Sequence, residues 1–135
     1  MREYVKDEWL NYKPVAWKRA RRKGNCYFDS QLPDKRAYVF LSSPWRRKIG
    51  LIQCPVRVDL EFHFKAPPSW SRAKRDSSVG RAHPSKPDID NLVKFFLDAF
   101  NGILWADDAL VAEVCAKKVY SDVNGIGVSI YGIES

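Results

Sequence analysis

The residues best suited to chemistry lie in the run KPDIDNLVK at 86–94. Asp88 and Asp90 are two residues apart, and in an extended segment such residues point to the same side. Asp90, Lys94 and Asp98 then recur at intervals of four, which would place them along one face of a helix. Paired carboxylates with an ammonium group one turn away could hold a hard divalent cation and neutralise charge on a phosphate.

A second acidic pair, Asp107 and Asp108, lies between this run and the next apolar stretch. If the two pairs met, their repulsion would raise some carboxyl pKa values unless a cation intervened. Mg²⁺ is the expected cation, because it prefers oxygen ligands and stabilises charge on a scissile phosphate. Ordinary alternatives stay open: a helix cap at Asp88, an i,i+4 pair between Asp90 and Lys94, and a polar turn at Asp107-Asp108.

Periodicity predicts the elements that must position these residues. Residues 55–66 alternate apolar and polar side chains, as a half-buried strand does. From Asp88 to about Asn101, apolar residues recur three and four apart, which predicts a helix. Asn101-Gly102 is a typical stop signal for that helix.

Two further strands and a second helix are also expected. Residues 109–120 and 126–133 are predicted to be strands, joined as an antiparallel hairpin by the turn at 121–125. A helix at 34–41 is expected to break or kink at Pro44.

Basic residues gather in the first part of the chain. Residues 1–86 carry 20 Lys and Arg against 8 Asp and Glu, whereas residues 87–135 carry 3 against 8. The basic cluster at 13–23 surrounds Trp17, and residues 67–86 read as a long basic loop. Both are predicted to grip a polyanion through phosphate contacts and stacking, the alternatives being a solubilising charge excess and an inward-packed Trp17. The candidate DNA-binding residues are Lys18, Arg19, Arg21, Arg22, Lys23, Arg72, Lys74, Arg75, Arg81 and Lys86.

Length and composition predict one domain over residues 1–135 of an ordinary globular protein. No apolar run is long enough for a membrane span, and the first residues lack the core of a secretory signal, so a cytoplasmic location is expected. Cys26, Cys54 and Cys115 show no CxxC-type spacing and are odd in number, which favours free thiols over a zinc site or a disulfide framework.

The string KPDIDNLVKFFLDAFNGILWADDALV strongly resembles the signature of the RusA-type Holliday-junction resolvase family. That signature has a D-x-D-N-x-x-K run opening a helix, a D-A-(L/F)-N-G run near its end, and a D-D pair before a strand. The likeness is close over about residues 83–115, where His83 is a further shared feature. The basic amino-terminal extension is a departure. The matching positions are Asp88, Asp90, Asn91, Lys94, Asp98, Ala99, Asn101, Gly102, Asp107 and Asp108.

The resemblance implies an α+β fold in which a small mixed or antiparallel sheet packs against two helices. It implies that Asp88, Asp90 and Asp108 bind Mg²⁺ and act in catalysis together with Lys94. It also implies a homodimer that resolves four-way DNA junctions by paired symmetric nicks. It assigns no role to Asp107 or His83.

Two other functions remain open on the sequence. One is a non-catalytic DNA-binding recombination module, although binding alone gains nothing from clustered acids that face a polyanion. The other is a nuclease selective for flaps or replication forks. A phage or prophage origin would suit a compact recombination enzyme.

Overall fold

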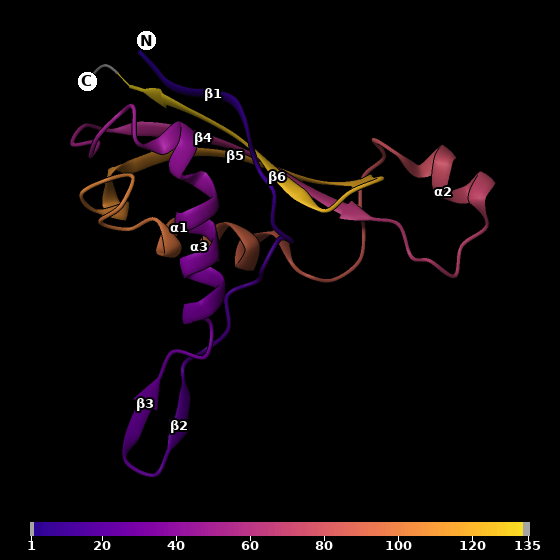
Figure 1. The fold of residues 1–135 in the computed structure, drawn as a ribbon, viewed down its shortest axis with the longest axis horizontal. Helices are drawn as coiled ribbons and strands as arrows, with labels where there is room; N and C mark the ends of the chain where they lie inside the picture. Colours follow the sequence, from indigo (N-terminus) through magenta and orange to yellow (C-terminus); the bar gives the residue numbers. More distant parts are fainter. Residues whose placement is uncertain (1, 134–135) are drawn as a thin grey trace.

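The computed structural model describes residues 2–133, whose centre is a mixed four-stranded sheet. Two of its neighbouring strands run parallel and the other pairs are antiparallel. Together with three α-helices, this sheet confirms the expected α+β class (Figure 1). In spatial order the strands are β1 (Glu3–Leu10), β6 (Gly125–Gly132), β4 (Val56–Lys65) and β5 (Val111–Ser121).

Two helices cover one face of the sheet and form the core with it. They are α1 (Leu32–Arg46) and α3 (Ile89–Ala99). Tyr38 of α1 packs edge-on against Phe95 of α3 with ring centroids 5.0 Å apart, and both side chains are fully buried. From the sheet, β4 contributes Val58 and Phe62, which are also fully buried. The predicted strand at 55–66 and the predicted helix after Asp88 are therefore confirmed.

Two smaller elements lie outside this core. The short hairpin of β2 (Arg21–Lys23) and β3 (Cys26–Phe28) projects away from the sheet and helices (Figure 1). Helix α2 (Arg72–Ser78) lies beyond one end of the sheet, well away from that hairpin (Figure 1).

The order of the last two strands corrects the expectation of a hairpin between them. β5 pairs in parallel with β4, and β6 pairs antiparallel with the other edge of β4, so β4 separates them. Most of β6 is buried whereas only the last three residues of β5 are, and placing the more apolar strand inside the sheet hides more apolar surface. Asn124 in the connection accepts a 2.8 Å hydrogen bond from the backbone N–H of Lys65 at the end of β4.

The expected break at Pro44 is also wrong, because α1 continues through it to Arg46. Pro44 lies in the last turn, so its missing N–H removes only the one backbone hydrogen bond to the carbonyl oxygen of Phe40 and leaves the preceding turns intact. Side chains on either side reinforce this turn: Ser42 and Arg46 both donate to the carbonyl oxygen of Val39, at 2.9 and 3.1 Å. The helix is longer than predicted because its inner face packs on the core.

The predicted long loop contains helix α2, whose sequence RAKRDSS has no apolar face that periodicity could reveal. Its start is capped by Ser71, whose hydroxyl accepts from the backbone N–H of Lys74 at 3.2 Å. Among residues 2–133, no helix is both long and apolar enough to cross a membrane.

Candidate active site

Asp88 occupies the N-cap position of α3 in the extended conformation expected for it, and its side chain makes no capping hydrogen bond. Lys86 Nζ lies 2.8 Å from Oδ1 and 3.0 Å from Oδ2 of Asp88, and this partner lowers the pKa of the exposed carboxyl. Lys118 donates to the carbonyl oxygens of Ser85 and Pro87, at 2.6 and 2.7 Å, and so fixes the segment that leads into the helix. Asp88 is thus held in its ionised form at the amino-terminal end of α3.

Asp90, Lys94 and Asp98 line one open pocket of about 590 Å³ together with Asp108. The first three follow the exposed side of α3 at the predicted four-residue spacing, while Asp108 arrives from the 3-10 turn Asp108–Leu110 before β5. The structure therefore brings one member of the second acidic pair, Asp108, to the pocket on the helix. Asp88 is not among the residues that line this pocket.

Asn101 at the end of α3 orients the second acidic pair. Its side-chain oxygen accepts from the backbone N–H of Asp108 at 3.0 Å, and Asp107 accepts from the backbone N–H of Ala109 at 2.9 Å. Asp107 thereby caps its own turn, while Asp108 faces the pocket. Partial desolvation, a hydrogen bond with Asp107 and the charges of Asp107 and Asp98 raise the pKa of Asp108.

Lys94 is held by an aromatic ring that lies far from it in the sequence. Its Nζ lies 3.5 Å from the ring centroid of Trp17, within the range of a cation–π interaction. The backbone N–H of Trp17 donates to the carbonyl oxygen of Asn91 at 2.9 Å, which fixes the ring against α3. Trp17 was expected either to stack on DNA or to pack inward, and it is half-buried beside Lys94.

Asp98 has a cation of its own that sequence reasoning missed. Lys35 of α1 bridges Asp98 and Asp29, with N–O distances of 2.8 and 2.7 Å. Partial burial alone would lower the pKa of Lys35, but its hydrogen bonds to Asp29 and Asp98 raise it overall. Asp98 is therefore neutralised from within the fold, whereas Asp90 and Asp108 form no ion pair with any residue from 2 to 133. A Lys in the first turn of a helix carries no motif that would have revealed this role.

The donor set at this pocket suits Mg²⁺ with a partly hydrated coordination shell. Across residues 2–133, no three His, Cys, Asp or Glu side chains are grouped closely enough to form a metal site on their own. Mg²⁺ normally takes one or two protein carboxylates and completes its shell with water and substrate phosphate oxygens. Asp90 and Asp108 would supply hard oxygen ligands. Desolvation first, and then Asp107 and the charge of Asp98, raise the pKa of Asp108, and a bound cation would favour its ionised form.

The candidate DNA-binding residues fall into separate groups. The stretch from Lys18 to Lys23 is wholly exposed and leads from Trp17 into the projecting hairpin. On α2, Arg72 lies 3.9 Å from Asp76, and Lys74 lies over Trp70 at 4.0 Å. The other members of this set are Arg75 on α2, Arg81 beyond it, and Lys86, which is paired with Asp88.

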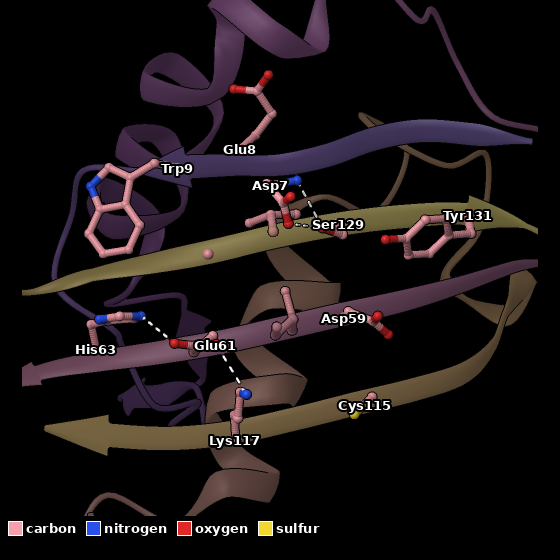
Figure 2. Close-up of a pocket in the computed structure, with 13 residues that line it drawn as sticks. Asp7, Glu8, Trp9, Asp59, Glu61, His63, Cys115, Lys117, Ser129 and Tyr131 are labelled. Carbon is pink, nitrogen blue, oxygen red and sulfur yellow. Dashed lines mark hydrogen bonds and ion pairs between the residues drawn. The ribbon is translucent and has the colours of Figure 1, made fainter. Parts of the chain in front are cut away.

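The opposite face of the sheet carries a different hollow, of about 390 Å³ (Figure 2). There Glu61 lies between His63 and Lys117, with N–O distances of 2.9 and 3.3 Å. Asp7 and Asp59 add carboxylates to the same surface. This acidic hollow shares no residue with the pocket on α3.

The chain combines a small α+β fold with a pocket of carboxylates and one lysine beside an exposed basic arm, as expected of an enzyme that acts on nucleic-acid phosphates. The family model described as Endodeoxyribonuclease RusA matches residues 11–131. The protein belongs to the RusA endodeoxyribonuclease family and is a DNA nuclease of the resolvase type. It is also similar to the uncharacterized protein YqaN of Bacillus subtilis strain 168, with 32% identity over 126 residues, covering 87% of this chain and 89% of YqaN.

Proposed function

We propose that this protein is a Mg²⁺-dependent endonuclease that resolves four-way DNA junctions by paired symmetric nicks. The observation that carries the proposal is the meeting of Asp90, Lys94 and Asp108 in one open pocket, although Asp108 comes from a different segment. A pocket for DNA alone would be lined by cations, because carboxylates repel the phosphate backbone. Carboxylates beside a lysine are instead what a metal-assisted attack on a phosphate requires.

In this proposal Asp90 and Asp108, which both line the pocket, would hold the metal. The bound ion supplies an activated water and stabilises charge on the scissile phosphate. Lys94 donates to a non-bridging phosphate oxygen, and Trp17 keeps its ammonium group aimed into the pocket. Lys35 holds Asp98 in an ion pair.

Asp88 joins the same set once DNA is bound. Its carboxylate is paired with Lys86, which is exposed and next to the pocket's helix. A phosphate group competes for Lys86, because charge-assisted contacts to phosphate are strong. Moving Lys86 to the backbone of the substrate frees Asp88 to act as the third carboxylate.

Paired nicks also imply two copies of the chain. Opposed strands of a junction are related by a two-fold axis, and a C₂ homodimer presents two identical pockets with that symmetry. A dimer therefore predicts that both nicks fall within the lifetime of one protein–DNA complex.

The test is cleavage of a synthetic four-way junction, end-labelled on each strand in turn, with Mg²⁺ or with EDTA. The wild-type protein should nick two opposed strands symmetrically and only with the metal. Asp90→Asn should bind the junction normally but cleave it at least ~100-fold more slowly, as when a group that stabilises transition-state charge is lost. Asp59→Asn is the matched control, since Asp59 pairs with Arg57 on the opposite face of the sheet.

The comparison of substrates separates the remaining functions. Equal cleavage by Asp90→Asn and wild type would overturn the assignment of the pocket. Binding without metal-dependent cleavage would identify a DNA-binding module, and faster cleavage of flaps or forks than of the junction would identify a different substrate.

A further inference from the structure

The hairpin of β2 and β3 has no evident role in stabilising the fold. Residues 18–28, KRARRKGNCYF, include five Lys and Arg and no acidic residue. The turn at Gly24 has a positive φ of 62°, a conformation that glycine adopts without strain. Every residue from 18 to 30 is exposed, and the hairpin extends into solvent away from the sheet (Figure 1). It therefore contributes nothing to the core.

The two faces of this hairpin each carry an arginine beside an aromatic ring. In the antiparallel register Arg22 lies opposite Tyr27, and Arg21 lies opposite Phe28. Residues directly opposite share a face, whereas successive residues point to opposite faces. One face therefore presents Arg22 with Tyr27, and the other presents Arg21 with Phe28.

Both aromatic rings are open to solvent, with Tyr27 68% and Phe28 46% exposed. The guanidinium of Arg22 lies 5.8 Å from the centroid of the Tyr27 ring, and its Nε donates to the carbonyl oxygen of Gly24 at 2.7 Å. An isolated two-stranded hairpin is only marginally stable in water. A ribbon that is basic and aromatic on both faces is suited to a polyanionic partner that lies against both sides at once.

The base of the hairpin is anchored firmly to the body. Gln31 is only 5% exposed. Its side-chain oxygen accepts a hydrogen bond from the backbone N–H of Lys18, and its side-chain amide nitrogen donates one to the carbonyl oxygen of Ala16, both at 2.8 Å. Its backbone N–H donates to Asp29 at 2.9 Å, and Asp29 is held in turn by Lys35. Lys35 also holds Asp98 in the candidate active site, so the hairpin and the pocket share one anchor.

We propose that this hairpin is a wedge that enters the branch point of the DNA, with one duplex arm against each face. The proposal rests on the junction substrate proposed above. Arg21 and Arg22 contact the phosphates of the two arms, and Tyr27 and Phe28 stack on the base pairs that end at the branch. A linear duplex offers no such end, so the wedge favours branched over linear DNA.

The test measures binding to a four-way junction and to a linear duplex of the same sequence, in an Asp90→Asn background that prevents cleavage. The double variant Tyr27→Ala with Phe28→Ala should lose at least ~10-fold in affinity for the junction, because loss of base–aromatic stacking costs roughly fivefold or more at each ring. Its affinity for the linear duplex should stay within about twofold, since arginine contacts to phosphate remain. The exchange Tyr27→Phe with Phe28→Tyr keeps both rings and is the matched control, expected to bind as the parent does.

A fluorescent base analogue, 2-aminopurine, placed beside the branch point gives a second readout. The parent and the ring-exchange control should change its fluorescence on binding, and the double alanine variant should not. Equal junction preference and an equal fluorescence change in the double alanine variant would overturn the wedge and leave the proposed function standing. If the parent itself shows no preference for the junction, the proposed function falls and the wedge falls with it.

Discussion

Removing the ring of Trp17 should slow DNA cleavage through Lys94 and through no other residue. Lys94 Nζ lies 3.5 Å from the ring centroid, and the ring is fixed by its backbone hydrogen bond to Asn91. A cation–π contact is worth about 0.5–1 kcal/mol when exposed and about 2 kcal/mol when desolvated. Half-burial of Trp17 places this contact between those limits. If the full contact acts in the transition state, Trp17→Ala should reduce the single-turnover rate by roughly 3- to 30-fold.

A double-mutant cycle isolates that coupling. Single-turnover cleavage is measured with saturating protein for Trp17→Ala, Lys94→Ala and the combined variant, with Trp17→Phe as the variant that keeps a weaker ring. Once Lys94 is gone, loss of Trp17 should cost almost nothing further, because the two side chains act as one unit. Thermal unfolding and junction affinity, measured in parallel, separate this effect from lost packing or lost contact with DNA. Fully additive losses in rate would refute the positioning role.

Two further predictions concern stability. The raised pKa of Asp108 means that its ionised form is disfavoured in the folded protein, so without metal Asp108→Asn should raise the free energy of unfolding. The gain should be less than ~1 kcal/mol because the carboxylates are exposed. The same variant should abolish any stabilisation by Mg²⁺, and unchanged thermal unfolding with and without the metal would contradict this prediction. Burial and the charge of Lys118 lower the pKa of His83 below 6.5, so stability should be complete above pH 6.5 and fall as pH drops through the folded-state pKa. Denaturant unfolding at pH 8 and pH 5 should show a smaller loss for His83→Phe; an unchanged loss would exclude His83.

The sequence predicts an element well where its hydrophobic period is undisturbed. Strand β4 alternates strictly and α3 has an unbroken apolar stripe, and both lie where the pattern indicates. Strand β1 was not predicted because a register shift between Val5 and Glu8 disrupts its alternation. At this irregularity Asp7 has φ +50° and its backbone N–H donates to the hydroxyl of Ser129 at 2.9 Å. The contact with Ser129 on the neighbouring strand β6 explains why the alternation of β1 fails at Asp7.

The order of the strands depends on competition between whole elements. The short turn between β5 and β6 favours their pairing as a hairpin, and the sequence around the turn contains no sign that another strand separates them. Parallel neighbours need a crossover connection, and α3 supplies one between β4 and β5. Because α3 must cover one face of the sheet, it determines where β5 lies. The residue pattern within β5 and β6 therefore cannot predict the strand order.

The same distinction applies to the candidate site. The spacing of Asp90 and Lys94 on α3 could be read directly, because an i,i+4 pair shares a helix face in any context. The approach of Asp108 depends on the hydrogen bond from its backbone to Asn101, which a motif places in sequence but not in space. Trp17 and Lys35 act across long sequence separations with no motif of their own. Sequence motifs therefore identify the side chains suited to chemistry, but they do not identify the residues that hold those side chains in position.

The two faces of the sheet differ in charge, and this difference bears on how DNA can approach. On the face without helices, Asp7, Asp59 and Glu61 surround a hollow in which Lys117 is a basic partner of Glu61 (Figure 2). Asp59 and Glu61 are already paired there with Arg57 and Lys117, so few cations on this face are left to contact a phosphate backbone. The pocket on α3 is acidic too, but the exposed basic stretch beginning at Lys18 continues directly from Trp17 at its wall. We therefore expect DNA to approach the α3 face, where the carboxylates that would hold a cation lie beside an exposed run of basic residues that can contact the phosphate backbone.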